Sequence, residues 1–523
     1  MKKEVEIAVP PEYLNDKEFL FNLTAQKLRL NPAEISAVVP LRRSIDARSS
    51  NPVFRILSNV YINESPPAEE RIINYRNVKS DKKVLIIGFG PAGMFAALRL
   101  IELGIKPVII ERGKDVQSRR RDLRAIQQFH KVNPDSNYCF GEGGAGTYSD
   151  GKLYTRSTKR GNVKKVLNIL VQHGAKEDIL IDAHPHIGSN KLPGIVKSIR
   201  ETILNCGGEI FFNSRVTDFI IKEEKILGVV FNDENEVIGD AVILATGHSA
   251  RDIFYLLHKH NIKIEPKPFA MGVRIEHPQP LINEIQYHTK QKNENLPAAN
   301  YSVACEINGR GVYSFCMCPG GIIVPASTSP GEIVVNGMSL SKRDSPFANA
   351  GFVVTVEEKD WKIYDNDYPF SALKLQQQIE TLTFDLANLP AGKAGKSQSA
   401  PAQRITDFVS KKTSATLLPT SYIPGLTSAP LHDSLPEFIT SALKKALFIF
   451  NKKMKGFYTE EAQIVAPESR TSSPIRIPRN KETLMHIQIE GLFPCGEGAG
   501  YAGGIVSSAI DGENCADAVE KVF

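Results

Sequence analysis

The stretch KVLIIGFGPAGMFAALRLIELGIKPVIIER (83–112) has the order of features of a dinucleotide-binding unit. The apolar run 84–87 predicts a buried strand, and GFGPAG (88–93) satisfies the G-x-G-x-x-G pattern of a loop that cradles a pyrophosphate. Pro91 stands in the first turn of the apolar helix that follows, and Gly104 ends that helix. The stretch therefore predicts a β-α-β unit whose helix N-terminus faces a phosphate.

An acid ends the second strand of this unit, PVIIE (107–111). Glu111 follows the glycine loop by about 20 residues, the position from which a carboxylate accepts hydrogen bonds from a ribose diol. The same carboxylate repels a 2′-phosphate, which argues against NADP at this loop. The sequence therefore predicts a site for FAD or NAD.

A second stretch, GEGGAG (141–146), matches the same glycine pattern. It follows the turn-rich NPDSNYCF and precedes TYSDGKLYTR, so neither a strand nor an amphipathic helix flanks it. Without a helix N-terminus the loop lacks the dipole and free N–H groups that bind a pyrophosphate. We expect its glycines to let the backbone pass close to a flat ligand instead.

The composition is that of a globular protein of about three domains, with 523 residues, 42% hydrophobic and 23% charged. Glycine and proline interrupt the longest apolar run, and no apolar segment follows the N-terminal lysines, so we expect no membrane span and a cytoplasmic location. The seven cysteines have no framework spacing and form no C-x-x-C, which indicates reduced thiols and disfavours a dithiol relay.

Two basic clusters, 118–124 and 156–165, stand out against a mild net charge of +6. Such clusters track phosphates in nucleic-acid-binding proteins. A solvated helix face together with neutralisation of an anionic cofactor explains them as well, and we favour that interpretation.

Two further segments complete the cofactor motif. The strand-rich segment 208–247 closes on VILATG, and the C-terminal segment 489–519 reads IEGLFPCGEGAGYAGGIVSSAIDGENCADAV. The second places Glu497 between glycines and Gly503–Gly504 before a helix. That helix would direct the positive end of its dipole at the ligand of the loop before it.

The E-R at 111–112, the ATG at 245–247 and the GLFPCGE…GG segment resemble the glutathione-reductase-like FAD-binding fold, over about 79–250 and 460–523. The strings GEGGAGTYSDGKL, HPHIG, ATGHSARD, SFCMCPGG, ESRTSSPIRI and GEGAGYAGGI resemble a family of uncharacterised FAD-dependent dehydrogenases. The resemblance implies one FAD, contacted by both glycine loops, with Glu497 on its ribityl chain. Glu497 departs from the aspartate more usual at that position.

The fold implied is of the α/β class: a Rossmann-like, glutathione-reductase-type FAD-binding domain with an inserted mixed α+β lobe and a small N-terminal β-α-β-β domain. We expect the N-terminal domain at 1–78, with Asn15 capping its helix. The FAD-binding domain is expected at 79–264 and 461–523, and the inserted substrate-side lobe at 265–460. The residues expected to contact the cofactor are Gly88, Gly90, Pro91, Ala92, Gly93, Glu111, Arg112, Gly144, Ala145, Gly146, Asp150, Lys152, Val216, Thr246, Gly247, Gly496, Glu497, Gly503, Gly504 and Ile505.

Three residues are candidates for catalysis. Arg470 could clamp a substrate carboxylate or form an ion pair within the fold. His186 could donate a proton to the substrate, although with His184 alone it forms no metal site, and we expect no metal. Cys316, in CMC, could be a redox thiol or a small buried residue.

The function expected is that of an FAD-dependent oxidoreductase that passes hydride through flavin N5 to or from a small organic substrate. The electron donor is left open between NAD(P)H, which would visit the flavin transiently, and an electron-donor protein. Two alternatives remain open: a flavoprotein that acts on RNA, which the mild charge disfavours, and an interaction protein whose flavin is not catalytic.

Overall fold

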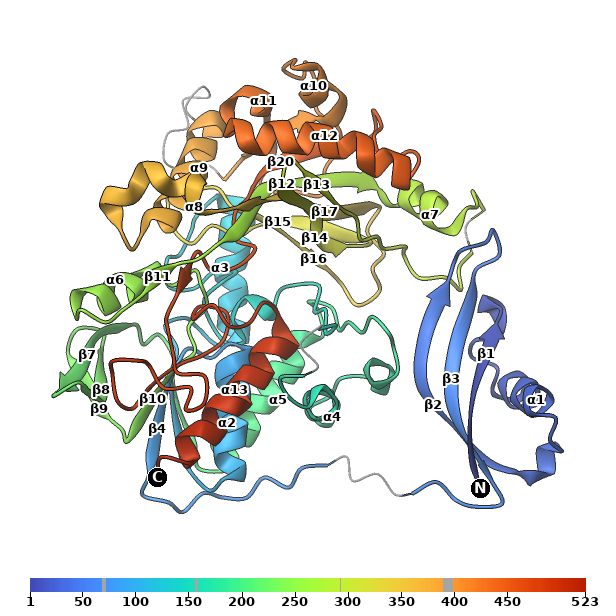
Figure 1. The fold of residues 1–523 in the computed structure, drawn as a ribbon, viewed down its shortest axis with the longest axis horizontal. Helices are drawn as coiled ribbons and strands as arrows, with labels where there is room; N and C mark the ends of the chain where they lie inside the picture. The colour runs from blue at the N-terminus through green and yellow to red at the C-terminus, as the bar shows by residue number, and fades with distance from the viewer. Residues whose placement is uncertain (68–71, 156–158, 292, 389–397) are drawn as a thin grey trace.

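The computed structural model describes residues 1–523 except 68–71, 156–158, 292 and 389–397. It has three parts, which Figure 1 shows as a parallel-sheet domain, a lobe above it that is built on a large, mostly antiparallel sheet, and a small N-terminal domain at one side. In the described ranges no helix has the length and apolar character needed to cross a membrane.

A five-stranded parallel sheet forms the centre of the first part, in the order β22-β10-β4-β5-β6. Its strands are β4 (Lys83–Ile87), β5 (Lys106–Ile110), β6 (Glu209–Phe211), β10 (Ala241–Leu244) and β22 (Leu492–Pro494). The central strands are apolar throughout because elements cover both faces of the sheet. The chain enters this sheet early and returns to it near the C-terminus, as the sequence predicts.

Helices α2 (Pro91–Glu102) and α13 (Ile505–Glu520) pack against each other in this domain (Figure 1). They approach closely at Gly512, where a Cβ atom would lie 2.1 Å from the carbonyl oxygen of Ala92. The other elements of the domain are α3 (Val116–Phe129), α4 (Val163–Gln172), α5 (Leu192–Asn205), α6 (Arg251–Lys259) and an antiparallel meander, β7 (Val216–Lys222), β8 (Lys225–Phe231) and β9 (Asn235–Ile238).

The second part is built on a seven-stranded sheet in the order β13-β14-β17-β12-β20-β18-β19. Its strands are β12 (Phe269–Pro278), β13 (Ala304–Ile307), β14 (Arg310–Cys318), β17 (Phe347–Val356), β18 (Ala400–Arg404), β19 (Leu426–Ser428) and β20 (Gln463–Glu468). Because β20 pairs with β12 and β18, the lobe reaches past the boundary expected at residue 460.

Helices cover one face of this large sheet (Figure 1). They are α7 (Gln279–Tyr287), α8 (Glu358–Trp361), α9 (Ser371–Asn388), α10 (Ile405–Ser410), α11 (Leu431–Ser434) and α12 (Glu437–Lys453). Two small two-stranded sheets complete the lobe: β15 (Gly321–Pro325) with β16 (Val335–Ser339), and β11 (Glu265–Pro266) with β21 (Ile475–Arg476).

The N-terminal domain holds β1 (Lys2–Val9), α1 (Lys17–Leu28), β2 (Ile35–Asp46) and β3 (Val53–Ile62). Its antiparallel sheet has the order β1-β3-β2, and α1 contributes to the core on one face. The cap of α1 is Asp16, whose carboxylate accepts the amide of Phe19 at 2.9 Å, so the expectation of Asn15 is wrong by one residue. Both side chains suit a cap, and the local hydrogen bond selects between them.

Candidate functional site

A cavity of about 410 Å³ lies at the carboxyl ends of the parallel strands. Ligands of open α/β sheets bind in this place, beyond the strand ends. The residues from the expected cofactor set that line it are Gly88, Gly90, Pro91, Ala92, Glu111, Arg112, Gly144, Ala145, Gly146, Asp150, Lys152, Val216, Thr246, Gly247, Glu497, Gly503, Gly504 and Ile505. The structure thus brings together segments that are more than 400 residues apart in the chain.

The Glu111 carboxylate joins the two glycine loops. Its Oε2 accepts the amide of Phe89 at 2.8 Å, and its Oε1 accepts the amide of Gly141 at 2.9 Å. Glu111 is 5% exposed and lines the cavity. Its position suits the ribose contact that the sequence predicts, and it also holds the second loop against the first.

Three cavity glycines are not required by protein packing. A Cβ atom at Gly247 or Gly503 would meet no protein atom within 4 Å, and one at Gly90 would meet only Cα of Gly144, at 3.9 Å. None of the three has the positive φ angle that favours glycine. A side chain there would extend into the cavity, so these positions fit a ligand that approaches the backbone closely.

Two glycines of the expected cofactor set do not line the cavity, and their role is in packing. A Cβ atom at Gly93 would lie 2.1 Å from the carbonyl oxygen of Gly88, so only glycine allows this turn. Gly496 donates its amide to Asp511 Oδ2 at 2.7 Å, which anchors the C-terminal loop to α13. Direct contact of either residue with the cofactor stays a prediction, and packing alone accounts for glycine at both positions.

Helix α13 begins at the cavity, with Gly504 as its cap and Ile505 as its first residue. The Ile505 side chain also contacts the second glycine loop, because a Cβ atom at Gly146 would lie 3.2 Å from it. The helix therefore directs its positive end toward the cavity, as the sequence predicts.

Glu497 and His248 face each other in the cavity, with Glu497 Oε1 3.7 Å from His248 Nε2. Burial raises the pKa of Glu497 to about 7, against the opposing charge of Lys267. Burial, and then the charges of Arg470 and Arg251, lower the pKa of His248 to about 3, so its imidazole is neutral at neutral pH. No hydrogen-bond partner of His248 Nδ1 exists among the described residues.

The comparisons with known proteins support an FAD site in this protein. Residues 81–125 match an FAD binding domain, and residues 268–471 match the family described as "FAD-dependent protein, C-terminal domain-like". Residues 1–61 match a domain of unknown function, DUF8436. A protein of Clostridium beijerinckii, named "Uncharacterized protein", is 39% identical over an alignment of 530 residues that covers 97% of this chain and 97% of that one. The chain belongs to this family of FAD-dependent proteins.

Solved structures similar to this FAD-dependent protein are remote. Glycine oxidase from Bacillus cereus is 14% identical with a TM-score of 0.29, over 85% of this chain and 96% of that one. CtdE, solved in complex with FAD, is 12% identical with a TM-score of 0.33, over 85% and 86%. The tetracycline destructase Tet(51) is 14% identical with a TM-score of 0.26, over 58% and 64%, so the chain spans less than two thirds of that protein. TM-scores this low do not support an inference about activity.

Cys316 of the FAD-dependent protein lines the same cavity from the second lobe. The pairing of β14 with β17 shifts register between Phe315 and Cys318, and Cys316 has a φ of 42°. Left-handed backbone at a residue other than glycine is strained, and strain of this kind gathers at functional sites.

The Cys316 thiol is held among hydrogen-bond donors. Its sulfur lies 4.0 Å from Lys152 Nζ, which also donates to the carbonyl of Met317. A hydrogen bond from the Cys318 thiol, and then the charges of Lys152 and Arg274, lower the pKa of Cys316 below its usual value. The arrangement favours a thiolate that faces the cavity.

Arg470 lines the cavity but is bound within the protein. Its Nε and Nη2 donate to both oxygens of Glu380, at 3.0 and 2.9 Å. Its remaining N–H groups go to Thr328, Ser249 and Glu332. Of the two alternatives for Arg470, the ion pair within the fold is therefore the one that the structure favours, because no donor remains for a substrate carboxylate.

His186 is not among the residues that line the cavity, so the prediction that it protonates a substrate gains no support from the cavity and stays a prediction. Its backbone pairs with Lys152, and its Nε2 lies 3.3 Å from the carbonyl oxygen of Ser341. Burial, and then the charge of Arg343, lower its pKa. His186 thus supports the loop that carries Lys152.

Arg112 and Asp150 line the cavity with their charges already paired. Arg112 bridges Asp135 and Asp252, at 2.8 and 2.9 Å. Asp150 accepts Arg343 Nη2 at 2.6 Å. Each therefore shapes the cavity, and each offers a cofactor at most its remaining hydrogen-bonding capacity.

His248 is the cavity residue that sequence reasoning missed. It stands in ATGHSARD, a string that carries the family resemblance, directly after Thr246 and Gly247. A polar side chain that follows a strand end at the cofactor edge is the signal that could have identified it.

One cluster in the described ranges has metal-ligand residue types: Cys495, Asp511 and Cys515, all buried. Arg479 occupies its centre, with both guanidinium Nη atoms on Asp511, at 3.0 and 2.6 Å. A cation already neutralises the carboxylate, so the cluster does not fit a metal ion.

Proposed function

We propose that this FAD-dependent protein is an oxidoreductase that passes hydride between its flavin and a small organic substrate. One observation carries the proposal: a single cavity is lined by both glycine loops, by the N-terminus of α13 and by Cys316 of the second lobe. A cofactor at the strand ends would therefore share one enclosed space with groups from the opposite lobe. Flavin sites that act on small molecules have this construction.

The contacts proposed for FAD follow the order of the lining residues. The first glycine loop and the N-terminus of α2 would hold the pyrophosphate, and Glu111 the ribose. Glu497 would lie on the ribityl side, with α13 directed at the flavin ring. When bound, FAD supplies the two-electron chemistry.

The chain's own residues would bind the substrate, exclude water and move protons. Cys316 and His248 are the groups best placed for this, because both line the cavity and neither is an ion-pair partner of an arginine. Cys316 would hold or release a proton at Sγ, and His248 would donate or accept one at its unpartnered Nδ1. His186 and Arg470 are not proposed for this role.

The electron donor remains part of the proposal. The second glycine loop is a short turn at Gly144–Gly146 and begins no long helix, so it does not form a second dinucleotide site. NAD(P)H as donor would therefore visit the flavin face transiently, and a protein carrier is the alternative.

The basic clusters do not decide in favour of action on RNA, because part of each is used within the protein although Arg120, Arg121 and Arg124 are exposed. In 118–124, Arg119 is fully buried and donates to the carbonyl oxygens of Asn137 and Glu142. In 156–165, residues 156–158 lie outside the described ranges, and Lys165 is paired with Glu102 and Glu513. Arg119 and Lys165 therefore form hydrogen bonds and ion pairs within the protein and do not offer their charges to an external phosphate.

The test is the visible absorption of the purified protein, followed anaerobically while NADH is added. A flavin band that bleaches quickly supports a nicotinamide-driven reductase, and a band that persists with NADH but bleaches with dithionite directs the search to other donors. A protein without a flavin band, which also fails to take up added FAD, would refute the proposed function.

A further inference from the structure

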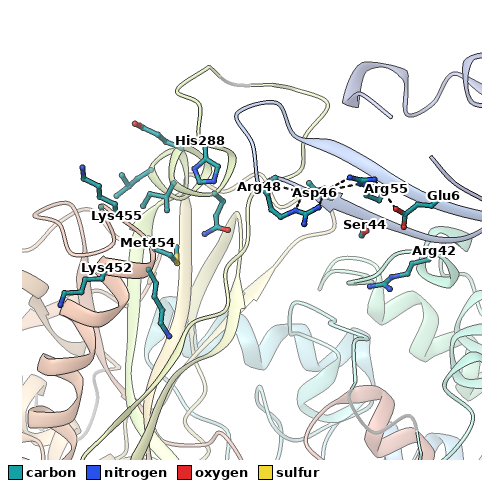
Figure 2. A pocket seen from close by; sticks show the side chains of 18 of the residues that line it. Glu6, Arg42, Ser44, Asp46, Arg48, Arg55, His288, Lys452, Met454 and Lys455 are labelled. Atoms are coloured by element: carbon teal, nitrogen blue, oxygen red, sulfur yellow. Dashed lines mark hydrogen bonds and ion pairs between the residues drawn. The ribbon is translucent and has the colours of Figure 1, made fainter. Parts of the chain in front are cut away.

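A second, larger cavity of about 1370 Å³ separates the N-terminal domain from the second lobe. One wall is the face of the N-terminal sheet that carries Glu6, Arg42 and Arg55, opposite the face that contributes to the core with α1. The other wall is α7 and the end of α12, from Lys452 to Gly456. Figure 2 shows the side chains of both walls around the open space. We call this cavity the interdomain cleft.

The lining of the interdomain cleft is cationic. Among the described residues, six positive and three negative side chains line it, a balance of +3 with His288 neutral. The positive set is Arg42, Arg48, Arg55, Lys452, Lys453 and Lys455, and the negative set is Glu6, Asp46 and Glu284. Both walls carry positive charge, so an anionic partner would be attracted from either side.

The acids of the cleft are largely neutralised, while several cations are not. Asp46 pairs with Arg48 at 2.6 Å and with Arg55 at 3.3 Å (Figure 2), and its hydrogen bond with Arg48 lowers its pKa. In contrast, no carboxylate of the described residues lies within ion-pair distance of the three exposed side chains Arg42, Lys452 and Lys455. These three are available to external carboxylates.

The rest of the lining indicates a protein as the partner rather than a nucleic acid. Ile45, Leu57, Leu281, Ile285 and Met454 also line the cleft, whereas no Phe, Tyr or Trp does among the described residues. Apolar side chains within a charged rim are typical of a protein interface, and nucleic-acid strands are held largely by aromatic stacking and phosphate contacts. The cleft therefore fits an acidic protein surface that also has apolar side chains.

Short-range contacts through His184 and Tyr154 lead from the interdomain cleft toward the flavin cavity. Burial lowers the pKa of His184, and the positive charges of Arg42, which lines the cleft, and of Arg343 lower it further. The His184 ring lies 5.2 Å from that of Tyr154, and Tyr154 lines the flavin cavity. The backbone makes the same connection, because Arg43 of β2 exchanges hydrogen bonds with Ile181 and Ala183.

We propose that the interdomain cleft docks a small acidic redox protein that reduces the flavin, a proposal that rests on the function proposed above. Each encounter removes one electron from the carrier's reduced centre. Two encounters deliver two electrons to the flavin, and solvent supplies one proton. Together these equal the hydride that is transferred to the substrate. The carrier takes the place of a nicotinamide domain, which the described residues do not form.

The experiment uses the flavin-loaded protein and two acidic carriers, a ferredoxin and a flavodoxin, each reduced beforehand. Flavin bleaching is followed by anaerobic stopped flow at several salt concentrations. The variant is R42E/K452E/K455E, which changes exposed side chains only. The matched control is K79E/K222E/K481E, which makes the same charge change at exposed lysines that do not line the cleft.

With at least one carrier, we expect the rate constant to fall about tenfold or more between low and high salt, as for steered association. The cleft variant should be slower by about the same factor at low salt, with the control close to the parent. Flavin content and dithionite reduction should be unchanged in both variants.

Three results would overturn the proposal: equal slowing of the cleft variant and the control, a rate that does not respond to salt, or no bleaching by either carrier in a protein that dithionite reduces. Each of them leaves the proposed function intact. That function fails separately, by the absence of any flavin.

Discussion

The carboxylate of Glu111 accepts the backbone amide of Gly141 at 2.9 Å and so ties the second glycine loop to the first. Two further amides, of Phe89 and Gly113, donate to the same carboxylate. The residue predicted to hold a ribose therefore also assembles the site around it.

Substitution Glu111→Gln should weaken both stability and cofactor binding. The amide NH₂ that replaces one oxygen cannot accept, so at least one buried N–H loses its partner, at a cost of about 1–3 kcal/mol. Urea unfolding of the apoprotein measures the first effect, and flavin content the second. Unchanged stability of the apoprotein would contradict the assembling role.

Substitution Gly90→Ala should leave the fold intact and weaken the binding of FAD. Its Cβ meets only Cα of Gly144 at 3.9 Å, so the free energy of unfolding should fall by about 1 kcal/mol or less, mainly because alanine caps α2 less well than glycine. The methyl group extends into the cavity, and we expect the dissociation constant for FAD to rise about tenfold or more, which corresponds to about 1.4 kcal/mol.

Two glycine variants serve as controls for Gly90→Ala. Gly194→Ala, on an exposed and unobstructed turn of α5, should retain FAD fully and gain up to about 1 kcal/mol of stability. Gly93→Ala should lose about 1–3 kcal/mol, because its Cβ overlaps the carbonyl of Gly88. If Gly90→Ala binds FAD as tightly as the parent does, the pyrophosphate does not lie on this loop.

Substitution Arg470→Met distinguishes the two roles considered for Arg470, an ion pair within the fold and a clamp on a substrate carboxylate. It leaves the Glu380 carboxylate buried with fewer donors, so we expect a loss of about 3 kcal/mol in urea unfolding. The double variant Arg470→Met/Glu380→Gln should recover part of that loss. A stable Arg470→Met protein with poor substrate affinity would instead favour the clamp.

Glu497 predicts a pH dependence of stability. Its pKa is raised to about 7 in the folded state by burial, above its ordinary value of 4.5. Between these two values the unfolded chain releases a proton that the folded chain keeps, so stability falls as pH rises from about 4.5 to about 7. We expect the difference to be on the order of 1 kcal/mol, because the side chain is 30% exposed and its charge is screened.

The comparison of the parent with Glu497→Gln isolates this effect. The free energy of unfolding of both apoproteins should be measured in urea at pH 5, 6, 7 and 8. We expect the value for the parent to fall relative to that for the variant up to about pH 7, and the difference to stay constant above it. Glu468, whose pKa is also raised to about 7 by burial, is present in both proteins and cancels. Parallel curves would show that Glu497 does not titrate in this range.

Cys316 should be the most reactive thiol of the apoprotein. Each unit by which its pKa is lowered increases the fraction of thiolate at neutral pH by about tenfold. Iodoacetamide reacts with the thiolate. Peptide mapping after brief alkylation should find Cys316 modified first, more slowly in Lys152→Met and more slowly with FAD bound. Equal labelling of Cys139, which also lines the cavity, would contradict the role assigned to Lys152.

The sequence by itself determined the dinucleotide unit from β4 to β5, the left-handed Gly104 that follows the end of α2 and the start of α13 at Ile505. These features are local, because strand periodicity, a glycine turn and a helix terminus are specified within a few residues. The sequence also indicated that GEGGAG is not a second pyrophosphate loop, and in the structure it forms a short turn at Gly144–Gly146.

The tertiary structure alone decided which side chains remain available for chemistry. Arg470 is bound to Glu380, 90 residues away in the chain, while His248 has an unpartnered nitrogen in the cavity. Arg119, which reads as part of an exposed basic cluster, is buried under the second loop. Partners so distant in sequence leave no periodic signal, because they are chosen by the packing of the sheet, the helices and the second lobe around one cavity.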